Sequence, residues 1–432
     1  MVDVDVTITD INPEGLGQSQ VNGRPLLVRN ALPGEQVSAR ILKKRKGVRF
    51  ADGYLQGSPN PERIVSACTA FPRCGGCNLH HLSYPAQLSL KQSQLERALV
   101  EHQVQPRQWR APVSAQKSGY RTKARLGVRQ LGDQVLVGFR ESFSNRVARL
   151  HECLTLTPRL SSLLLPLRQM IAQLSQPNQI PQIELAQGDD GVSVIVRHLY
   201  ELTAADMDQL AVFQRATRTD VVLQSAGYDT LRGLAHGQEK PAPRTYQLPR
   251  HGLTMHFQPH QFTQVNMAVN QLLIDAVCAY LTPRPKRLVD LFCGIGNFSL
   301  PLARKGVQVL GVEAVESAVE QARLNAQFNG VPCAFDVADL YSADISAELI
   351  EAVAGADALL LDPPRSGAGP QLARWLEVFH GGHIVYVSCN PKSFAEDAAA
   401  LQNAGFVLQE VGVFDMFPYT AHIETLGYFV RS

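Results

Sequence analysis

The sequence predicts an α/β protein built from a small β-barrel, a mixed α/β segment, and a doubly wound domain with a mainly parallel sheet. Two patterns support this prediction. Over residues 1–58, apolar and polar residues alternate in short runs that glycine and proline interrupt, as in a barrel of short strands. From about residue 285, apolar runs of strand length alternate regularly with helical patterns, which is typical of βαβ units whose sheet is covered on both faces.

The length and composition fit a globular protein of two or three domains. The chain has 432 residues, and its apolar share of 45% is sufficient for packed cores. It contains no apolar run long enough to cross a membrane, and its first residues lack the pattern of a signal peptide. Of eight cysteines, three lie close together and the others are scattered, unlike the disulfide framework of a secreted protein. We therefore expect a cytoplasmic protein with no membrane partner, and no obligate protein partner is evident.

The predicted elements divide the chain into three domains, residues 1–58, 59–250 and 251–432. The middle domain begins with a proline-containing linker and a cysteine-bearing segment, and a helical pattern follows at 84–102. It then mixes strands with an amphipathic helix, predicted at 160–174. The strand-like runs of the middle domain are 120–129, 134–140 and 192–198, and those of the third domain are 287–292, 307–313, 356–364 and 383–389.

Basic residues are concentrated in two segments, although the net charge is only +2. Lys43–Arg49 is the run KKRKGVR, and Arg107–Arg149 contains ten basic residues opposed only by Asp133 and Glu141. Such segments, set against a more acidic remainder, suit the phosphate backbone of a nucleic acid. A basic face that serves only solubility is an equal alternative for either segment alone.

Three cysteines within ten residues predict a metal site. Cys68, Cys74 and Cys77 have the spacing C-x5-C-x2-C, and Cys153 is the expected fourth ligand. In a cytosolic chain, clustered thiols bind metal far more often than they pair as disulfides. The spacing does not separate zinc from an iron–sulfur cluster, although the N–H groups of Gly75–Gly76 can point at sulfur and mildly favour the cluster.

A glycine-containing loop after the first strand of the third domain predicts a cofactor site. Residues 288–298 read LVDLFCGIGNF, a strand and a Gly-x-Gly turn that opens a helix, so the backbone can approach a ligand closely. A dinucleotide fingerprint needs another Gly or Ala where Ser299 stands. Asp290 before the turn and Glu313 at the end of the next strand instead favour S-adenosylmethionine, because an acidic residue there can bind both ribose hydroxyls. The alternative is a glycine-rich turn in another kind of doubly wound protein.

Two acidic residues follow later strands of the same domain. Asp339 lies after the third strand, placed to reach an adenine ring or nearby backbone. Asp362 begins the motif DPPRSG at the carboxyl end of a strand, where open parallel sheets have their active sites. Methyltransferases that act on exocyclic amines usually have an aromatic residue after the two prolines, to stack on the base. Arg365 stands there instead, which argues against methylation of an amine.

Cys389 and Glu424 predict covalent chemistry on an electron-poor ring. Cys389 follows the apolar run HIVYV at the same end of the sheet, and a helix starting near Pro391 favours its thiolate. Carbon 5 of a pyrimidine is a poor nucleophile until a thiolate adds to carbon 6 and creates a carbanion. Glu424, in DMFPYTAHIET, is the candidate base. The alternatives are a buried structural cysteine, a surface carboxylate, and, for His422, a turn residue that only forms hydrogen bonds.

These motifs resemble those of a known family. DPPRSG, IVYVSCN and FDMFPYTAHIE are similar to the paired signatures of the RNA uracil-5 methyltransferases. The N-terminal barrel resembles a TRAM domain, an OB-like module, and the four cysteines resemble the [4Fe–4S] site of that family. The resemblance covers essentially the whole chain and implies a Rossmann-like, seven-stranded methyltransferase domain at 251–432. It further implies that the barrel and the basic surface of residues 59–250 bind RNA.

The resemblance implies a role for each motif residue. Cys389 is the expected nucleophile, and Glu424 is the expected base that removes the proton from carbon 5. The iron–sulfur site is expected to brace the RNA-binding domain without a catalytic role. The positions that resemble cofactor-site residues are Gln264, which also resembles a contact to the flipped base, and Phe292, Asn297, Glu313, Asp339 and Asp362.

The substrate that the layout implies is 23S ribosomal RNA, at U1939. Two departures bear on this target, since the ribosomal subgroup often has DPAR for DPPR and Asn in place of Asp339. The alternatives are another uridine of 23S rRNA, or uridine 54 of transfer RNA, whose bacterial enzymes often lack the barrel. From a different class, an RNA-binding chaperone or a redox-sensing module with a vestigial enzyme domain is disfavoured by the intact motifs.

Overall fold

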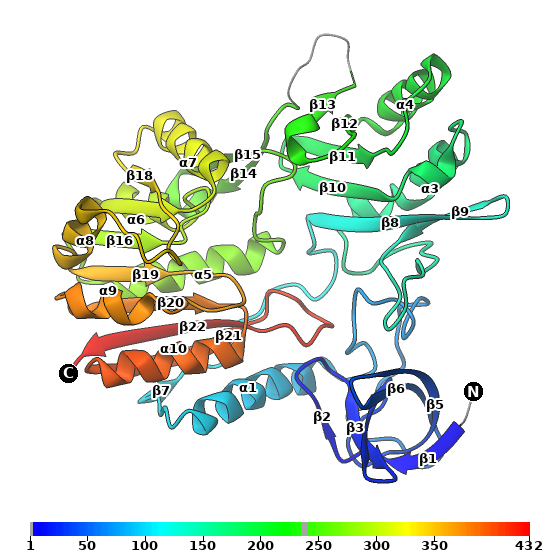
Figure 1. The fold of residues 1–432 in the computed structure, drawn as a ribbon, viewed down its shortest axis with the longest axis horizontal. Coiled ribbons are helices and arrows are strands. Elements are labelled where there is room, and N and C mark those ends of the chain that lie inside the picture. Colours follow the sequence, from blue (N-terminus) through cyan, green and yellow to red (C-terminus); the bar gives the residue numbers. More distant parts are fainter. Residues whose placement is uncertain (1–2, 235–240) are drawn as a thin grey trace.

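The computed structural model of the protein describes residues 3–234 and 241–432. Figure 1 shows the N-terminal strands and the central sheet on one side of the molecule and the C-terminal domain on the other. Residues 1–2 of the predicted barrel and residues 235–240 of the predicted middle domain lie outside the described residues. Within the described ranges, no helix is both long and apolar enough to cross a membrane.

The N-terminal part is a curled sheet, as its alternating pattern predicts. Its strands are β1 (Asp3–Thr7), β2 (Asp10–Ile11), β3 (Gly17–Val21), β4 (Arg24–Arg29), β5 (Gln36–Arg45) and β6 (Val48–Leu55). Their order is β1-β5-β6-β4-β3-β2, and all neighbours are antiparallel except β4 and β6. The hydroxyl of Ser19 donates to the carbonyl of Thr7 (2.9 Å), so the third strand meets the first and the sheet curls back on itself. A small apolar core fills the inside.

The middle part contains a second six-stranded sheet. Its strands are β8 (Lys123–Leu131), β9 (Gln134–Gly138), β10 (Gln182–Gly188), β11 (Gly191–Arg197), β12 (Asp220–Gln224) and β13 (Arg232–Gly233), in the order β13-β12-β11-β10-β8-β9. The strands predicted at 120–129, 134–140 and 192–198 are thereby confirmed. α4 (Ala204–Thr217) joins the parallel pair β11 and β12. Short 3₁₀ helices are η1 (Pro177–Gln179), η2 (Tyr228–Thr230) and, further on, η3 (Pro249–His251).

The prediction of one continuous helix at 160–174 is wrong. The chain forms two short helices instead, α2 (Pro158–Ser161) and α3 (Leu164–Ala172). Pro166 is the physical reason, because it lacks an N–H and its ring excludes the carbonyl four residues earlier from a continuous helix. The helix therefore restarts, and Pro166 lies in the first turn of α3, where its missing N–H costs nothing.

The C-terminal domain has the predicted mainly parallel sheet. Its strands are β16 (Arg287–Leu291), β17 (Gln308–Glu313), β18 (Ala334–Val337), β19 (Ala358–Leu361), β20 (His383–Ser388), β21 (Phe406–Phe414) and β22 (Glu424–Arg431). A short eighth strand from earlier in the chain, β7 (Gln108–Trp109), adds to the edge. The order is β18-β17-β16-β19-β20-β22-β21-β7, and only β22 runs antiparallel to its neighbours.

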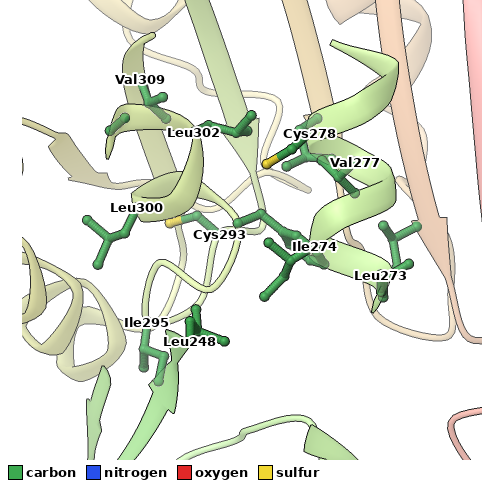
Figure 2. Packing of buried hydrophobic residues seen from close by; sticks show 14 of the residues in the cluster. Leu248, Leu273, Ile274, Val277, Cys278, Cys293, Ile295, Leu300, Leu302 and Val309 are labelled. Atoms are coloured by element: carbon green, nitrogen blue, oxygen red, sulfur yellow. The ribbon is translucent and has the colours of Figure 1, made fainter. Parts of the chain in front are cut away.

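Helices cover both faces of this sheet, as Figure 1 shows. One apolar core contains side chains of α5 (Met267–Tyr280), α6 (Ser299–Arg304) and α7 (Glu316–Asn329). Figure 2 shows part of it, with Ile274 and Cys278 of α5 on the side that faces Leu302 of α6. The hairpin of β14 (Arg244–Leu248) and β15 (Leu253–Phe257) closes the same core. The second core contains side chains of α8 (Ala347–Ala354), α9 (Leu372–Val378) and α10 (Pro391–Asn403).

A helix from the predicted middle domain packs on the C-terminal sheet. α1 (Tyr84–Glu101) lies against α10 and β21, and its Leu95 and Leu99 belong to the second core. The helical pattern at 84–102 is thus confirmed. The buried face of α1 also carries Gln87, Lys91 and Gln94, so it presents polar groups as well as leucines to its neighbours. The domain division at residues 58 and 250 stays a prediction.

Candidate active site

The carboxyl ends of the parallel strands bring the predicted site residues to one edge of the sheet. Phe292 follows β16, Glu313 ends β17, Asp362 follows β19, and Cys389 follows β20. Because parallel strands run the same way, their carboxyl ends meet at the same edge. β22 runs in the opposite direction, so its first residue, Glu424, also lies there. The candidate nucleophile, base and cofactor-site residues therefore share one edge.

The register of β20 and β22 makes Cys389 and Glu424 neighbours. Ser388 pairs with Thr425 in the antiparallel ladder, and Cys389 and Glu424 are the next residues outward on their strands. Directly opposed side chains of antiparallel strands have Cβ atoms about 5 Å apart. A thiol and a carboxyl group on neighbouring strands, one position beyond a paired residue, are placed to act on the two adjacent carbons of one ring.

The Cys389 thiol is harder to ionise than a free thiol. Burial and the charge of Glu424 raise its pKa to about 11, with a smaller contribution from Asp362, while Arg365 lowers it. α10 begins beside it at Pro391, so the predicted helix start is confirmed. In the free protein the thiol is therefore favoured over the thiolate, because burial and the two carboxyl groups outweigh Arg365. The contribution of the helix to the thiolate stays a prediction.

Glu424 is almost completely buried, with 3% of its surface exposed. Burial, and then the neighbouring Asp362, raise its pKa well above the ordinary value, while Arg365 lowers it. Burial disfavours the ionised form of a carboxyl group, so a carboxylate in this place is a stronger base than one in water. Its environment thus suits a group that accepts a proton during a reaction.

Arg365 connects the three loops of this edge, a role that the sequence did not reveal. Its Nη2 donates to Nδ1 of His422 (3.0 Å), and its carbonyl accepts a hydrogen bond from the Asn390 side chain (2.8 Å). Desolvation and the guanidinium charge lower the pKa of His422 to about 4, so the ring is neutral and can accept this bond. The only signal in the sequence was the position of Arg365 directly after two prolines.

The Phe292–Phe298 loop has the backbone conformation of a tight cofactor loop. Phe292, Gly294 and Gly296 have φ angles of 69°, 55° and 88°, in the left-handed region that glycine adopts at little cost. A Cβ on Gly296 would also lie 3.2 Å from the ring of Phe335. The loop therefore needs its glycines, and Phe292 is held in an unusual conformation.

Two carboxyl groups beside the loop fit a polar ligand. The Glu313 carboxylate accepts hydrogen bonds from the backbone of Gly294 (3.3 Å), Ala314 (2.8 Å) and Val315 (3.0 Å), which fix it next to the loop. Asp290 is completely buried, and burial raises its pKa to about 7. One of its oxygens has no hydrogen-bond partner among the described residues. A buried polar atom without a partner fits a site completed by a donor from a ligand.

The other predicted cofactor-site residues lie in different surroundings. Asn297 forms two hydrogen bonds with the side chain of Asn270 (3.0 and 2.9 Å), which anchor the loop to α5. Asp339 is exposed after β18, and Gln264 is buried with 8% exposure. Phe262, which the sequence motifs did not single out, is 77% exposed close to Gln264 and offers a ring for stacking on a base. The assignment of these residues to cofactor binding stays a prediction.

The four cysteines predicted to bind metal line one cavity. Cys68, Cys74, Cys77 and Cys153 share it with aromatic side chains that include Phe71, His80 and Phe139. The N–H of Gly76 points at the sulfur of Cys74 (3.5 Å), as predicted. A Cβ on Gly76 would lie 2.9 Å from Phe139, so this turn packs closely against its neighbours. Four thiols around one space are a donor set that fits an iron–sulfur cluster or zinc.

The cysteine site is separate from the carboxyl edge of the sheet, but one of its neighbouring residues contacts the loop that leads to that edge. The ring of His80 stacks on Tyr419, with centroids 4.1 Å apart and an interplanar angle of 10°. Tyr419 belongs to the loop that leads to Glu424. The segment that carries the cysteines therefore also contacts the loop before Glu424.

Comparisons with known proteins agree with this geometry. A family model described as tRNA (Uracil-5-)-methyltransferase matches residues 83–432, and a TRAM domain model matches residues 3–53. The 23S rRNA (uracil(1939)-C(5))-methyltransferase RlmD of Alkalilimnicola ehrlichii is 42% identical over 438 residues, covering 99% of this chain and 96% of its own. The protein of the same name from Hahella chejuensis is 38% identical over 442 residues, with coverages of 98% and 96%.

A solved structure shares the fold of the whole chain. It is the tRNA (uracil-54, C5)-methyltransferase of Pyrococcus abyssi in complex with S-adenosyl-L-homocysteine. The TM-score is 0.76, and the match covers 99% of this chain and 100% of the other, at 24% identity. At that identity the likeness shows the fold, and the curled sheet, central domain and doubly wound domain all take part in it.

Proposed function

The chain belongs to the tRNA (uracil-5-)-methyltransferase family, and on that premise we propose that it methylates carbon 5 of U1939 in 23S ribosomal RNA. The reaction is the S-adenosylmethionine-dependent methylation of a uridine in RNA at carbon 5. The choice of U1939 is supported by relatives that carry this activity in their names and match nearly the full chain at 38% and 42% identity.

Cys389 and Glu424 are the proposed nucleophile and base, and their adjacent places at the ends of β20 and β22 carry this assignment. The thiolate of Cys389 adds to carbon 6 of the uracil, and the electron pair of the double bond moves to carbon 5 and the neighbouring carbonyl. Carbon 5 then takes the methyl group. Glu424 accepts the remaining proton from carbon 5, the double bond reforms, and Cys389 leaves as a thiolate.

S-adenosylmethionine, when bound, supplies the methyl group and a positive sulfonium charge. We assign its site to the loop and strand ends described above, with Gln264, Phe292, Asn297, Glu313, Asp339 and Asp362 as the contacting residues. A positive charge nearby lowers the pKa of thiol and carboxyl groups. The raised pKa of Cys389 keeps the thiol protonated in the free protein, and the sulfonium charge of the bound cofactor adds to the effect of Arg365, which already lowers that pKa.

A basic groove is the proposed contact for the phosphate backbone of the RNA. The groove has a volume of about 940 Å³ and lies between the cysteine segment, the β8–β9 hairpin and the chain that follows it. Phe143 of that chain contacts the ring of Phe50 in the barrel (5.1 Å), which connects the groove to the basic β5–β6 strands. Positive side chains along a groove bind phosphates without reading sequence. The exposed arginines that line it are Arg73, Arg129, Arg146 and Arg149.

A [4Fe–4S] cluster is the proposed occupant of the cysteine site. The four thiols around one cavity and the N–H of Gly76 aimed at Cys74 support it. A single zinc ion would hold its sulfurs about 2.3 Å from the metal. The same four thiols are also a donor set for zinc, which is the alternative occupant. Iron and sulfide analysis of anaerobically purified protein, with zinc as the control, tests this assignment.

The test of the function is methylation of defined RNAs by the purified protein. The substrates are a 23S rRNA fragment that contains U1939, the same fragment with cytidine at that position, and a transfer RNA. We expect 5-methyluridine only in the first. Methylation of the transfer RNA at position 54 would refute the target, and no methylation of any RNA would refute the activity and favour a binding protein.

Two variants test the roles of the site residues. Cys389→Ala should methylate no uridine, because nothing then adds to carbon 6. Glu424→Gln should accumulate a methylated protein–RNA adduct that survives denaturation, because the proton on carbon 5 is not removed. The absence of that adduct would remove Glu424 from the role of base.

A further inference from the structure

The loop Asp415–Ile423 joins β21 to β22 and ends directly before Glu424. It makes few hydrogen bonds within itself, chiefly from the N–H and the hydroxyl of Thr420 to the carbonyl of Phe417 (3.2 and 2.9 Å). Tyr419 has a φ of 65°, an unfavourable conformation for a tyrosine. Such a residue keeps this conformation only when its surroundings hold it there. The position of Glu424 therefore depends on what contacts this loop.

Helix α1 holds the loop from one side through buried polar groups. Nζ of Lys91 forms an ion pair with Asp415 (2.5 Å) and donates to the carbonyl of Phe417 (3.1 Å). The side chains of Lys91 and Asp415 are both fully buried. Gln87 accepts from the N–H of Tyr419 (3.0 Å), at the strained position itself.

The segment that carries Cys77 holds the loop from another side. The N–H groups of Asn78 and Leu79 both donate to the carbonyl of Tyr419 (3.1 and 2.9 Å), and His80 stacks on its ring. The side chain of Asn78 accepts from the N–H of Ala421 (2.9 Å). Gln87 donates to the carbonyls of Leu79 and Leu82, so α1 and this segment are also bonded to each other. Asn78 directly follows Cys77, so a shift of Cys77 moves the donors that hold the loop.

We propose that the segment Cys77–His80 and α1 form a clamp that positions Glu424 to remove the proton from carbon 5, and that the clamp couples this step to the cysteine site. The inference rests on the proposed role of Glu424 as base. Asn78, Gln87 and Lys91 are positioning residues in it, since they touch the loop and not the substrate. A displacement of about 1 Å at a reacting group can cost about a hundredfold in rate.

Two substitutions of Asn78 separate the clamp from general folding. Asn78→Ala removes the acceptor for Ala421 and also the bond that the Asn78 amide donates to the carbonyl of Glu14. Asn78→Asp keeps the acceptor for Ala421 and replaces the amide donor with a carboxylate oxygen that faces the Glu14 carbonyl. Gln92→Ala is the matched control on α1, because among the described residues the Gln92 amide bonds only along the helix, to Glu96 (2.9 Å).

The readout is the fate of the covalent intermediate on RNA with an ordinary uridine. We expect Asn78→Ala to lower kcat about 10- to 100-fold with little change in KM for RNA, and to accumulate the denaturation-resistant adduct. Asn78→Asp and Gln92→Ala should stay within roughly threefold of the native kcat and show no adduct. A merely destabilised protein would lose active molecules without accumulating an adduct.

Glu424→Gln is the reference variant that distinguishes failure of the clamp from failure of the base assignment. An adduct with Glu424→Gln and none with Asn78→Ala would overturn the clamp and leave the base assignment intact. No adduct with either variant would overturn the base assignment, and the clamp with it. Equal loss in Asn78→Ala and Asn78→Asp would also contradict the clamp, because only one of them loses the bond to Ala421.

Hydrogen exchange tests the coupling to the cysteine site without measuring activity. Peptides that cover residues 415–423 are compared in the purified protein, in the protein after iron removal by a chelator, and in Cys77→Ser. We expect the amides of Tyr419 and Ala421 to exchange faster when the site is empty or altered, because their acceptors Gln87 and Asn78 are displaced. Residues 182–197 in the middle of the central sheet are the control and should be unchanged. Unchanged exchange in the loop would overturn the coupling.

Discussion

Replacing Lys91 with methionine tests the buried ion pair that anchors the loop before Glu424. Lys91 and Asp415 lie 2.5 Å apart, and neither side chain is exposed to solvent. Methionine keeps an unbranched apolar stem but removes the charge and the bond to the carbonyl of Phe417. Within residues 3–234 and 241–432, Asp415 then keeps only the hydroxyl of Tyr84 (2.7 Å) as a side-chain donor.

The expected loss of stability follows from the uncompensated charge. Removing one partner of a buried ion pair typically costs about 3–5 kcal/mol. Because the Tyr84 hydroxyl still stabilises Asp415, we expect a loss of about 3–4 kcal/mol, including about 1 kcal/mol for the bond to the Phe417 carbonyl. The double variant Lys91→Met/Asp415→Asn leaves no buried charge, so its loss should be smaller than the sum of the single losses by about 1 kcal/mol or more.

Urea unfolding followed by tryptophan fluorescence measures these losses in the relevant domain. The chain has two tryptophans, and both lie on the C-terminal sheet, Trp109 in β7 and Trp375 in α9. Lys392→Met is the surface control, since Lys392 is 77% exposed and its partner Glu396 is 3.8 Å away; we expect a change within about 0.5 kcal/mol. A loss below about 1 kcal/mol for Lys91→Met, together with additive single losses, would refute the reasoning.

Three further predictions concern the other parts of the molecule. The pKa of Cys389 is raised to about 11, so its alkylation by iodoacetamide in the free protein should be slow at pH 8 and should accelerate as the pH rises toward 11. Peptide mass spectrometry measures the alkylation rate, and a rate that has already reached its plateau near pH 8 would contradict this prediction. Replacing both Arg146 and Arg149 with acidic residues should weaken RNA binding and leave kcat at saturating RNA unchanged. The slope of the logarithm of the RNA-binding constant against the logarithm of the salt concentration should decrease in magnitude by about 2. Gly76→Ala should lower the iron content per chain, because the added Cβ would lie 2.9 Å from the ring of Phe139. Gly382→Ala is the control and should leave the iron content unchanged, because a Cβ there would have no other atom within 4 Å.

Much of the fold could be predicted because its signals are local. Strand lengths, glycine turns and the alternation of apolar runs specify the curled sheet and the βαβ order, and each depends on residues close together in the chain. The split of the helix at 160–174 shows the limit of that reasoning. Its apolar periodicity is continuous, but Pro166 interrupts the hydrogen-bond ladder and divides it into α2 and α3.

The candidate site could be predicted in its residue types but not in its electrostatics. Cys389, Glu313 and Asp362 could be assigned to one edge from strand ends alone, because parallel strands end together. Glu424 could be assigned only by its motif, because its place at this edge depends on the antiparallel strand β22. The state of the Cys389 thiol could not. It depends on burial and on Glu424 and Asp362, whose combined effect outweighs that of Arg365.

The sequence by itself determined the chemistry of this protein: which strands end in a thiol or a carboxyl group, where the glycine loop lies, and which cysteines group together. These are properties of short stretches, so they can be read without coordinates. Only the tertiary structure decided how the sites are held. Tyr84 and Lys91 lie 331 and 324 positions before Asp415, yet both bond to it inside the protein. No local pattern specifies such a contact, because it arises from the packing of α1 and the cysteine segment against the loop before Glu424.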